Sequence, residues 1–309
     1  MTCLNNTTFA FLLLALLNFV PRPAHAAQSN DNCTGFITSV PAVIAAPGTW
    51  CLKQNLVTSA TTGSGAIGIQ GDHVVIDCND FRIEAQGGAI GTGIAINGDD
   101  TFKTTVRNCR IHGFANGIVL YQSDSDRAEN PARVGNIVED NTVEAASNYA
   151  IYVVGDGSVV RRNQILNTSC PAVNGLSSNC YAIQTGHSVD VLDNTVSGVT
   201  ATGGVGSAFG IEAYANANGT ISGNRIRNLL GGGVQGGFAG SAFGIDLTNS
   251  GRMTIRGNDM AVNSDADAGI YASGVSCNDP SSRASDNVIN GFTNALNLCS
   301  DAGGNDITP

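Results

Sequence analysis

One short hydrophobic pattern recurs along most of the chain and indicates a repeat. A small residue precedes an aliphatic residue, a variable residue and a second small or aliphatic residue, as in Gly117-Ile118-Val119-Leu120. The aliphatic anchors of eight copies are Ile94, Ile118, Ile151, Ile183, Ile211, Ile245, Ile270 and Leu296, at intervals of 24 to 34 residues. Alternation with a period of two predicts short strands, and copies at such intervals are typical of a solenoid.

A second pattern lies between successive anchors and places an Asn between apolar positions, as in Val160-Arg161-Arg162-Asn163-Gln164-Ile165. The Asn recurs at Asn141, Asn163, Asn194, Asn224, Asn258 and Asn287. Asn tolerates the left-handed backbone of a tight bend, and amides stacked coil on coil can hydrogen-bond along a ladder. We therefore predict a structural row of Asn in an all-β parallel helix of about eight coils, each buried only by its neighbours. The segments between anchors lack ten residues of helical periodicity, which argues against an α/β fold.

These repeats resemble those of the right-handed parallel β-helix proteins of the pectin-lyase-like superfamily, from about Ile67 to Ile307. The opening, Ala46-Pro47-Gly48-Thr49-Trp50-Cys51-Leu52 followed by Val74-Val75-Ile76-Asp77-Cys78-Asn79, is similar to that of many secreted bacterial members. The resemblance implies a right-handed β-helix over residues 66–309, after an N-terminal cap segment at residues 27–65. It implies little about chemistry, because the superfamily includes lyases, hydrolases, epimerases and non-enzymatic proteins.

The N-terminus predicts export. An apolar run from Phe9 to Val20 precedes Ala24-His25-Ala26. The run is too short to span a bilayer, and together with the small-residue motif it is typical of a signal peptide at residues 1–26. No later segment approaches eighteen consecutive apolar residues, so we expect no membrane span and a secreted or periplasmic protein.

The cysteine count agrees with export. Eight cysteines remain after removal of the signal peptide, and an even number in an exported chain predicts disulfides. The expected pairs are Cys33–Cys51, Cys170–Cys180 and Cys277–Cys299. Cys78–Cys109 stays open, because these two positions are offset by three residues in adjacent coils. No CxxC pair is present, which argues against a zinc site.

The charge restricts the partners. The chain carries 15 Lys and Arg against 25 Asp and Glu, a net charge of −10, so nucleic acid is a poor partner. A polyuronate would be repelled unless calcium bridged it to the protein, whereas a neutral glycan meets no such barrier. The acidity also has a simpler explanation, the solubility of an exported protein.

The outward positions of the anchor strands carry the candidate site. The residue between two inward aliphatic positions faces outward, and coil by coil these residues are Ala95, Val119, Tyr152, Gln184, Glu212, Asp246, Tyr271 and Asn297. The next outward row contains Tyr121 and Tyr214. We predict that Tyr152, Gln184, Tyr214 and Tyr271 bind sugar through ring stacking and hydrogen bonds. The alternative is that tyrosine is simply favoured in strands.

Two near-identical segments place two acids side by side. Gly206-Ser207-Ala208-Phe209-Gly210-Ile211-Glu212 matches Gly240-Ser241-Ala242-Phe243-Gly244-Ile245-Asp246. Parallel strands lie about 4.8 Å apart, so the carboxyl groups of Glu212 and Asp246 should lie roughly 5 Å apart on an exposed face. We predict either an acid/nucleophile pair of a retaining hydrolase, with His187 as a proton carrier, or a calcium site with oxygen ligands. The alternative is two solvated surface acids.

Long insertions are expected to wall this face, at Asn167–Cys180, Ser197–Ser207 and Asn228–Ser241. The sequence thus predicts a secreted β-helix protein that acts on or binds a polysaccharide, as a lyase, a hydrolase or an epimerase-like enzyme. Whether it is an enzyme stays open, and so does its oligomeric state. The alternative is a non-catalytic extracellular scaffold or adhesion protein.

Overall fold

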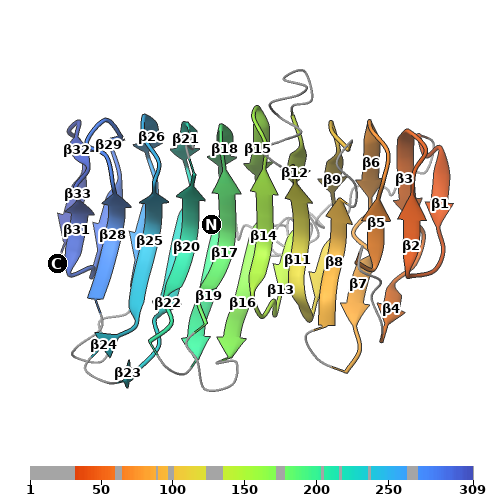
Figure 1. Cartoon of the computed structure of the whole chain (residues 1–309), viewed down its shortest axis with the longest axis horizontal. Coiled ribbons are helices and arrows are strands. Elements are labelled where there is room, and N and C mark those ends of the chain that lie inside the picture. Colours follow the sequence, from red (N-terminus) through yellow and green to blue (C-terminus); the bar gives the residue numbers. More distant parts are fainter. Residues whose placement is uncertain are drawn as a thin grey trace, which may run out of the picture. The chain divides into compact units, whose positions relative to one another are not determined.

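Three parallel sheets run side by side along residues 32–309 of the computed structural model (Figure 1). The structure describes residues 32–59, 65–87, 90–96, 101–122, 135–171, 178–202, 205–215, 218–235, 238–262 and 271–308, which contain no helix. The signal peptide predicted at residues 1–26 lies outside these ranges.

Sheet A contains β1 (Gly35–Ile37), β3 (Gly48–Leu52), β6 (Val74–Asp77), β9 (Thr105–Arg107), β12 (Ile137–Glu139), β15 (Ser158–Arg161), β18 (Val189–Leu192), β21 (Gly219–Ser222), β26 (Met253–Arg256), β29 (Arg283–Ser285) and β32 (Ser300–Asp301). Sheet B contains β2 (Ala42–Ile44), β5 (Ile67–Ile69), β8 (Ile90–Ile96), β11 (Phe114–Tyr121), β14 (Tyr149–Val154), β17 (Cys180–Gly186), β20 (Ala208–Tyr214), β25 (Ser241–Thr248), β28 (Tyr271–Cys277) and β31 (Asn294–Asn297).

Sheet C contains β4 (Leu56–Thr58), β7 (Arg82–Ala85), β10 (Arg110–His112), β13 (Thr142–Glu144), β16 (Gln164–Pro171), β19 (Thr195–Thr202), β22 (Arg225–Leu230), β27 (Asp259–Ala261), β30 (Val288–Asn290) and β33 (Asp306–Thr308). A short antiparallel pair, β23 (Val234–Gln235) and β24 (Phe238–Ala239), lies between β22 and β25 in the chain.

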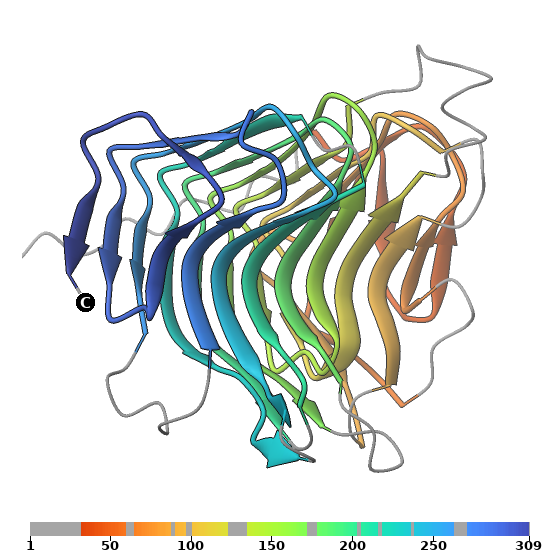
Figure 2. The ribbon, with the colours of Figure 1, turned by 60° about the vertical axis from the view of Figure 1, so that its left-hand side comes forward.

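Each turn takes one strand from sheet B, then sheet A, then sheet C, and the next turn stacks in register upon it (Figure 2). The described strands form ten such turns, from β2–β3–β4 to β31–β32–β33, preceded by β1. The sequence predicted about eight, because the count began at Ile94 and left out the two earlier strands, Ala42-Val43-Ile44 and Ile67-Gly68-Ile69. Within the segment assigned to a cap, residues 27–65, strands β1 to β4 already pair with the three sheets.

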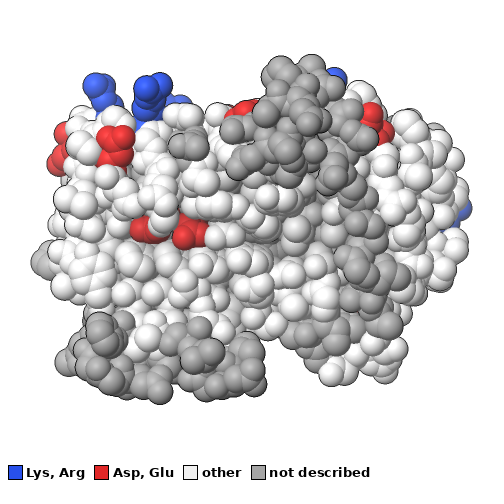
Figure 3. Space-filling model, in the orientation of Figure 1, with Lys and Arg blue, Asp and Glu red and all other residues white. Residues whose placement is uncertain are grey.

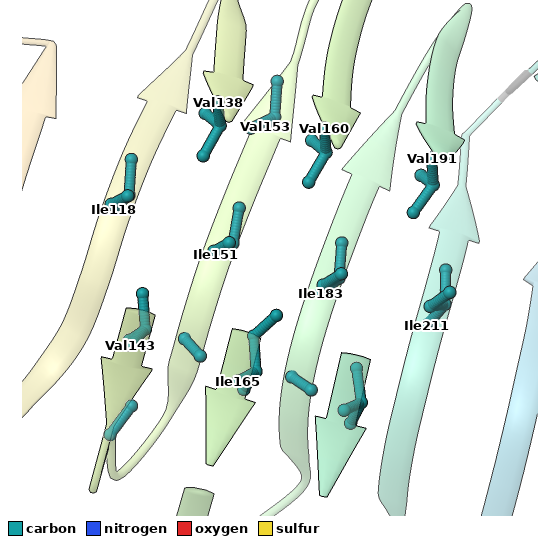
Figure 4. Packing of buried hydrophobic residues seen from close by; sticks show 14 of the residues in the cluster. Ile118, Val138, Val143, Ile151, Val153, Val160, Ile165, Ile183, Val191 and Ile211 are labelled. Carbon is teal, nitrogen blue, oxygen red and sulfur yellow. The ribbon is translucent and has the colours of Figure 1, made fainter. Parts of the chain in front are cut away.

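Aliphatic side chains fill the interior in rows that run from turn to turn. Ile118, Ile151, Ile183 and Ile211 succeed one another on sheet B and are fully buried (Figure 4). A turn buries these side chains only against the turns on either side, as the repeat pattern predicted.

In strand β28 the anchor is Val275 and not the predicted Ile270. Ile245 is paired with Val275, and Val275 with Leu296, whereas the predicted anchor, Ile270, lies outside the described residues. The sequence offers two matching phrases here, Gly269-Ile270 and Gly274-Val275. The structure uses the second, and it thereby shifts Tyr271 away from the row in which it was predicted.

The Asn row is a ladder, as predicted. From Asn141 to Asn305, each side-chain amide donates to the side-chain oxygen of the next Asn at 2.9–3.0 Å. The left-handed conformation belongs to the residue before the Asn, for example Asp193 with φ 55°. The bend prediction was therefore wrong by one residue, because the Asn uses its side chain for the ladder while its predecessor turns the chain.

Four disulfides join the eight cysteines from Cys33 onwards. The three expected pairs are confirmed, with Cα–Cα distances of 5.8, 5.3 and 5.1 Å for Cys33–Cys51, Cys170–Cys180 and Cys277–Cys299. The pair left open, Cys78–Cys109, is also formed, with a Cα–Cα distance of 4.7 Å. Four disulfides are consistent with an extracellular location. In the part of the chain that the structure describes, no helix is long and apolar enough to cross a membrane.

Candidate functional site

Two acids lie in the middle of the outer face of sheet B. Glu212 on β20 and Asp246 on β25 are register partners on adjacent parallel strands, so their backbones lie about 4.8 Å apart. Figure 3 shows acidic side chains over these two strands, surrounded by uncharged residues. The side chains are only 7% and 6% exposed. The sequence predicted the pairing, but not that neighbouring side chains would cover both acids.

A local bend explains why aromatic and acidic residues share this face. A Cβ atom at Gly210 would lie 2.6 Å from the carbonyl oxygen of Gly244 and 2.7 Å from the buried Ile226 side chain. Gly210 and Ile211 therefore both face the interior, and the strand presents Phe209 and Glu212, three residues apart, to the outside. A side chain larger than hydrogen has no room at Gly210.

Each acid has its own hydrogen-bond partners. The Gln184 side-chain amide on β17 donates to Glu212. The Thr248 hydroxyl donates to Asp246, and the Ser276 side chain is a further hydrogen-bond partner of that carboxyl group. Gln184 and Ser276 belong to the same outward row as the acids, because Gln184 pairs with Glu212 and Asp246 with Ser276.

Burial makes both acids retain a proton at higher pH than usual. Burial raises the pKa of Glu212 to about 7, against the hydrogen bond from Gln184, and the Asp246 carboxylate raises it further. Burial also raises the pKa of Asp246, against the hydrogen bonds from Thr248 and Ser276. The outer face of sheet B thus holds one carboxyl group that exchanges its proton near neutral pH.

Three of the four predicted sugar-binding residues lie around this pair. Tyr152 pairs with Gln184 in the row of the acids, and Tyr214 follows Glu212 by two residues on β20. The hydroxyl groups of Tyr152 and Tyr214 are hydrogen-bonded to each other, and burial raises the pKa of both phenols.

Tyr271 does not join them. It pairs with Ser241 at the start of β25, and its ring lies 6.2 Å from that of Phe243. The prediction for Tyr271 assumed that Ile270 was the anchor. With Val275 in that place, Ser276 occupies the position beside Asp246.

A row of seven aromatic rings crosses the same face, and four of these rings were not predicted from the sequence. Successive ring centroids lie 4.9–6.2 Å apart. The row runs in the order Tyr121, Tyr152, Tyr149, Tyr181, Phe209, Phe243 and Tyr271. Its end members are the most exposed, Tyr121 at 47% and Tyr271 at 39%. The missed signal is an aromatic residue directly before the small residue of four repeats, as in Phe209-Gly210.

His187 lies at a corner rather than in the row of acids. It follows β17 in a left-handed turn conformation, with φ 66°, and its side chain is buried. Its backbone carbonyl accepts hydrogen bonds from the amides of Val189 and Asn218 at 3.1 and 3.2 Å. A role for its side chain as a proton carrier stays a prediction.

The predicted insertions partly continue sheet C. β16 and β19 extend through them and remain paired, from Thr168–Val199 to Pro171–Thr202. Residues 172–177, 203–204 and 236–237 lie outside the described ranges, so the predicted walls stay predictions. Among the residues with described positions, no group of three or more His, Cys, Asp or Glu side chains is placed to hold a metal ion. Calcium at Glu212 and Asp246 likewise stays a prediction.

Comparison with known proteins gives one family match. Residues 92–237 match the model of the right-handed beta helix region. Comparison with curated proteins gives no significant match.

Several solved structures are similar. A tailspike protein of Escherichia coli bacteriophage HK620 is 12% identical with a TM-score of 0.46, over 85% of this chain and 57% of the tailspike chain. The chain therefore spans little more than half of that protein. The A-module of a mannuronan C-5 epimerase from Azotobacter vinelandii is 10% identical with a TM-score of 0.38, over 90% and 91% of the two chains. An α-1,3-glucanase from Streptomyces thermodiastaticus is 14% identical with a TM-score of 0.32, over 86% and 64%. With its three stacked parallel sheets and the match over residues 92–237, the chain has the fold of a right-handed parallel β-helix.

Proposed function

We propose that the outer face of sheet B binds a glycan and hydrolyses one of its glycosidic bonds, with Glu212 and Asp246 as the two catalytic carboxyl groups. The observation that carries this proposal is the pairing of two largely buried carboxyl groups on adjacent strands, both with raised pKa values. Purely structural surface acids gain nothing from such burial, because it disfavours their charged forms.

The surroundings of the two acids favour different roles for them. Glu212, with a pKa of about 7, holds a proton for the leaving oxygen of the glycosidic bond. Asp246 has two hydroxyl partners, Thr248 and Ser276, that favour its carboxylate form, which suits a nucleophile. Two groups whose environments differ in this way divide into acid and base.

The spacing of the strands favours retention of configuration. Retaining enzymes have carboxyl groups about 5–5.5 Å apart, close to the separation of adjacent parallel strands. Asp246 would attack the anomeric carbon while Glu212 protonates the departing oxygen. Water, deprotonated by Glu212, would then cleave the ester bond between Asp246 and the sugar, which returns both carboxyl groups to their first state.

The test is turnover by purified protein on a panel of neutral and acidic polysaccharides. Reducing ends measure hydrolysis, and ultraviolet absorbance of unsaturated uronates measures lyase activity. We expect reducing ends without unsaturation, and a loss of at least about 100-fold in kcat for E212Q and for D246N, as expected for a removed acid or nucleophile.

Glu144→Gln is the matched control, because Glu144 lies on β13 of sheet C and on a different face. It should keep full activity. Undiminished turnover in E212Q and D246N would overturn the assignment, and unsaturated products would replace hydrolysis by elimination. Binding of glycan without turnover in the wild type would leave the non-catalytic alternative.

A further inference from the structure

A polar cavity of about 500 Å³ lies in the turns that lead from sheet B to sheet A. Its lining comes from three successive turns, after β20, β25 and β28. The lining residues are Asn218, Asn249, Ser250, Gly251, Arg252, Asn278 and Asp279. The volume is within the range of small-molecule sites, about 300–1,000 Å³.

The cavity is joined to Asp246 by short stretches of chain. Thr248, which donates to Asp246, directly precedes Asn249 on the cavity wall. Ser276, the other hydrogen-bond partner of Asp246, precedes Asn278 by two residues. The cavity lining therefore begins one or two residues beyond the hydrogen-bond partners of Asp246 along the chain.

Backbone contacts build the cavity walls. The backbone amide of Asn218 donates to the His187 carbonyl at 3.2 Å. The Ser250 hydroxyl donates to the carbonyl of Ala213 at 2.9 Å, and the backbone amide of Arg252 donates to the Ser281 hydroxyl at 3.0 Å. The three turns are thus tied to one another, and the wall positions are preformed.

The side chains at the rim suit sugar hydroxyl groups. Asn249 and Asn278 each offer an amide with both donors and an acceptor, which matches a pair of adjacent hydroxyls. Hydrogen bonds from the backbone and the side chain of Ser281 lower the pKa of Asp279, and the positive charge of the nearby Arg252 lowers it further. The cavity lining therefore contains one cation and one carboxylate, with no surplus positive charge for an acidic sugar.

We propose that this cavity is a sugar subsite that binds a neutral hexose unit next to the cleaved bond. The proposal rests on the proposed function of the acid pair and adds the substrate class and its direction. The row of rings lies on the other side of the acids, at Phe209 and Phe243. A neutral glycan would then cross the face along the strands, from the ring edges over Glu212 and Asp246 into the cavity.

The probes are cellotetraose, laminaritetraose, maltotetraose and tetragalacturonic acid, with dissociation constants measured by calorimetry. We expect at least one neutral tetrasaccharide to bind, with tetragalacturonic acid at least about 10-fold weaker. N278A and R252Q should each raise the dissociation constant of the neutral tetrasaccharide by about 5- to 20-fold, the effect of one lost hydrogen bond to a bound ligand. Titration should also shift the side-chain amide NMR signals of Asn249 and Asn278.

Arg225→Gln is the matched control. Arg225 lines a second cavity, of about 490 Å³, on sheet C, so its replacement should leave binding unchanged. Unaltered binding in both N278A and R252Q, a preference for tetragalacturonic acid, or no binding of any neutral tetrasaccharide would overturn the subsite. The turnover test of E212Q is separate. If E212Q keeps its turnover, the proposed hydrolysis is wrong. If N278A and R252Q have the KM of the wild type, only the subsite proposal is wrong.

Discussion

At the scale of single residues, the burial of Glu212 sets it apart from an ordinary surface acid. An acid on the surface of a solenoid is ordinarily solvated, yet Glu212 is only 7% exposed and has a pKa of about 7. The cover comes from its row, because Gln184 and Asp246 lie on either side of it. Burial that serves no packing purpose is what links this residue to chemistry.

The raised pKa predicts how stability depends on pH. Between the ordinary value of 4.5 and about 7, the folded state holds a proton on Glu212 that the unfolded state has lost. Stability therefore falls as pH rises through this window, by up to about 3 kcal/mol at about 1.4 kcal/mol per unit. Asp246 acts in the same direction, because its pKa is also raised.

Thermal unfolding of the wild type from pH 4 to pH 9 measures this dependence. E212Q cannot ionise, so its melting temperature should change less between pH 5 and pH 8, and at pH 8 it should exceed that of the wild type. Glu144→Gln should follow the wild type. A pH profile of E212Q that parallels the wild type would contradict the raised pKa.

At the scale of elements, the Asn ladder is the main polar structure inside the bends. The Asn194 side chain accepts from the backbone amide of Asn163 and donates to the Val160 carbonyl. It also bridges to Asn224 on the next turn. The ladder therefore satisfies buried backbone groups that a strand-to-strand bend leaves without partners.

Asn194→Ala should lower the free energy of unfolding by about 1–3 kcal/mol, because buried groups of Asn163 and Val160 lose their partners. Chemical denaturation measures the loss. Asn305→Ala, at the end of the ladder, removes partners from one side only and should cost less. Activity of the folded fraction should survive both changes, and a loss of activity with unchanged stability would show that the ladder is not purely structural.

The elements also show what sequence alone can predict. The Gly-aliphatic phrase predicts most strands of sheet B, and the duplicated segment before Glu212 and Asp246 predicts their register. The Gly-aliphatic phrase does not identify the anchor of β28, because Gly269-Ile270 and Gly274-Val275 fit it equally well. Only pairing with Ile245 on one side and Leu296 on the other decides between them. Burial of the acids was also beyond prediction, because it depends on side chains from several turns.

At the scale of the whole molecule, stability is distributed turn by turn. Every turn contacts chiefly the turns before and after it, so the end turns are covered on one side only. The disulfides Cys33–Cys51 and Cys277–Cys299 lie in the terminal turns. They restrain the parts of the molecule that would otherwise open first.

Replacement of Cys277 and Cys299 by Ala should therefore act locally. A disulfide closing a loop of this separation, 22 residues, contributes about 3 kcal/mol. Hydrogen exchange should become faster in β31 to β33 and stay unchanged in β14 to β20. The Cys170–Cys180 disulfide closes an interior loop. The matched control, in which these two cysteines are replaced by Ala, should leave hydrogen exchange in the last turn unaltered. Faster exchange throughout the molecule would contradict turn-by-turn stability.

The adjacency of β20 and β25 has a consequence for how such a protein can evolve. Solenoids grow and shrink by duplication or deletion of whole turns, and most sites in this chain would tolerate such events. Insertion of a turn without an acid in this row between Glu212 and Asp246 would instead double the strand spacing to about 9.6 Å. That distance is close to the upper limit of the range of inverting glycosidases, about 6.5–9.5 Å. On the proposed function, one such insertion would turn a double-displacement site into a single-displacement one without altering either acid.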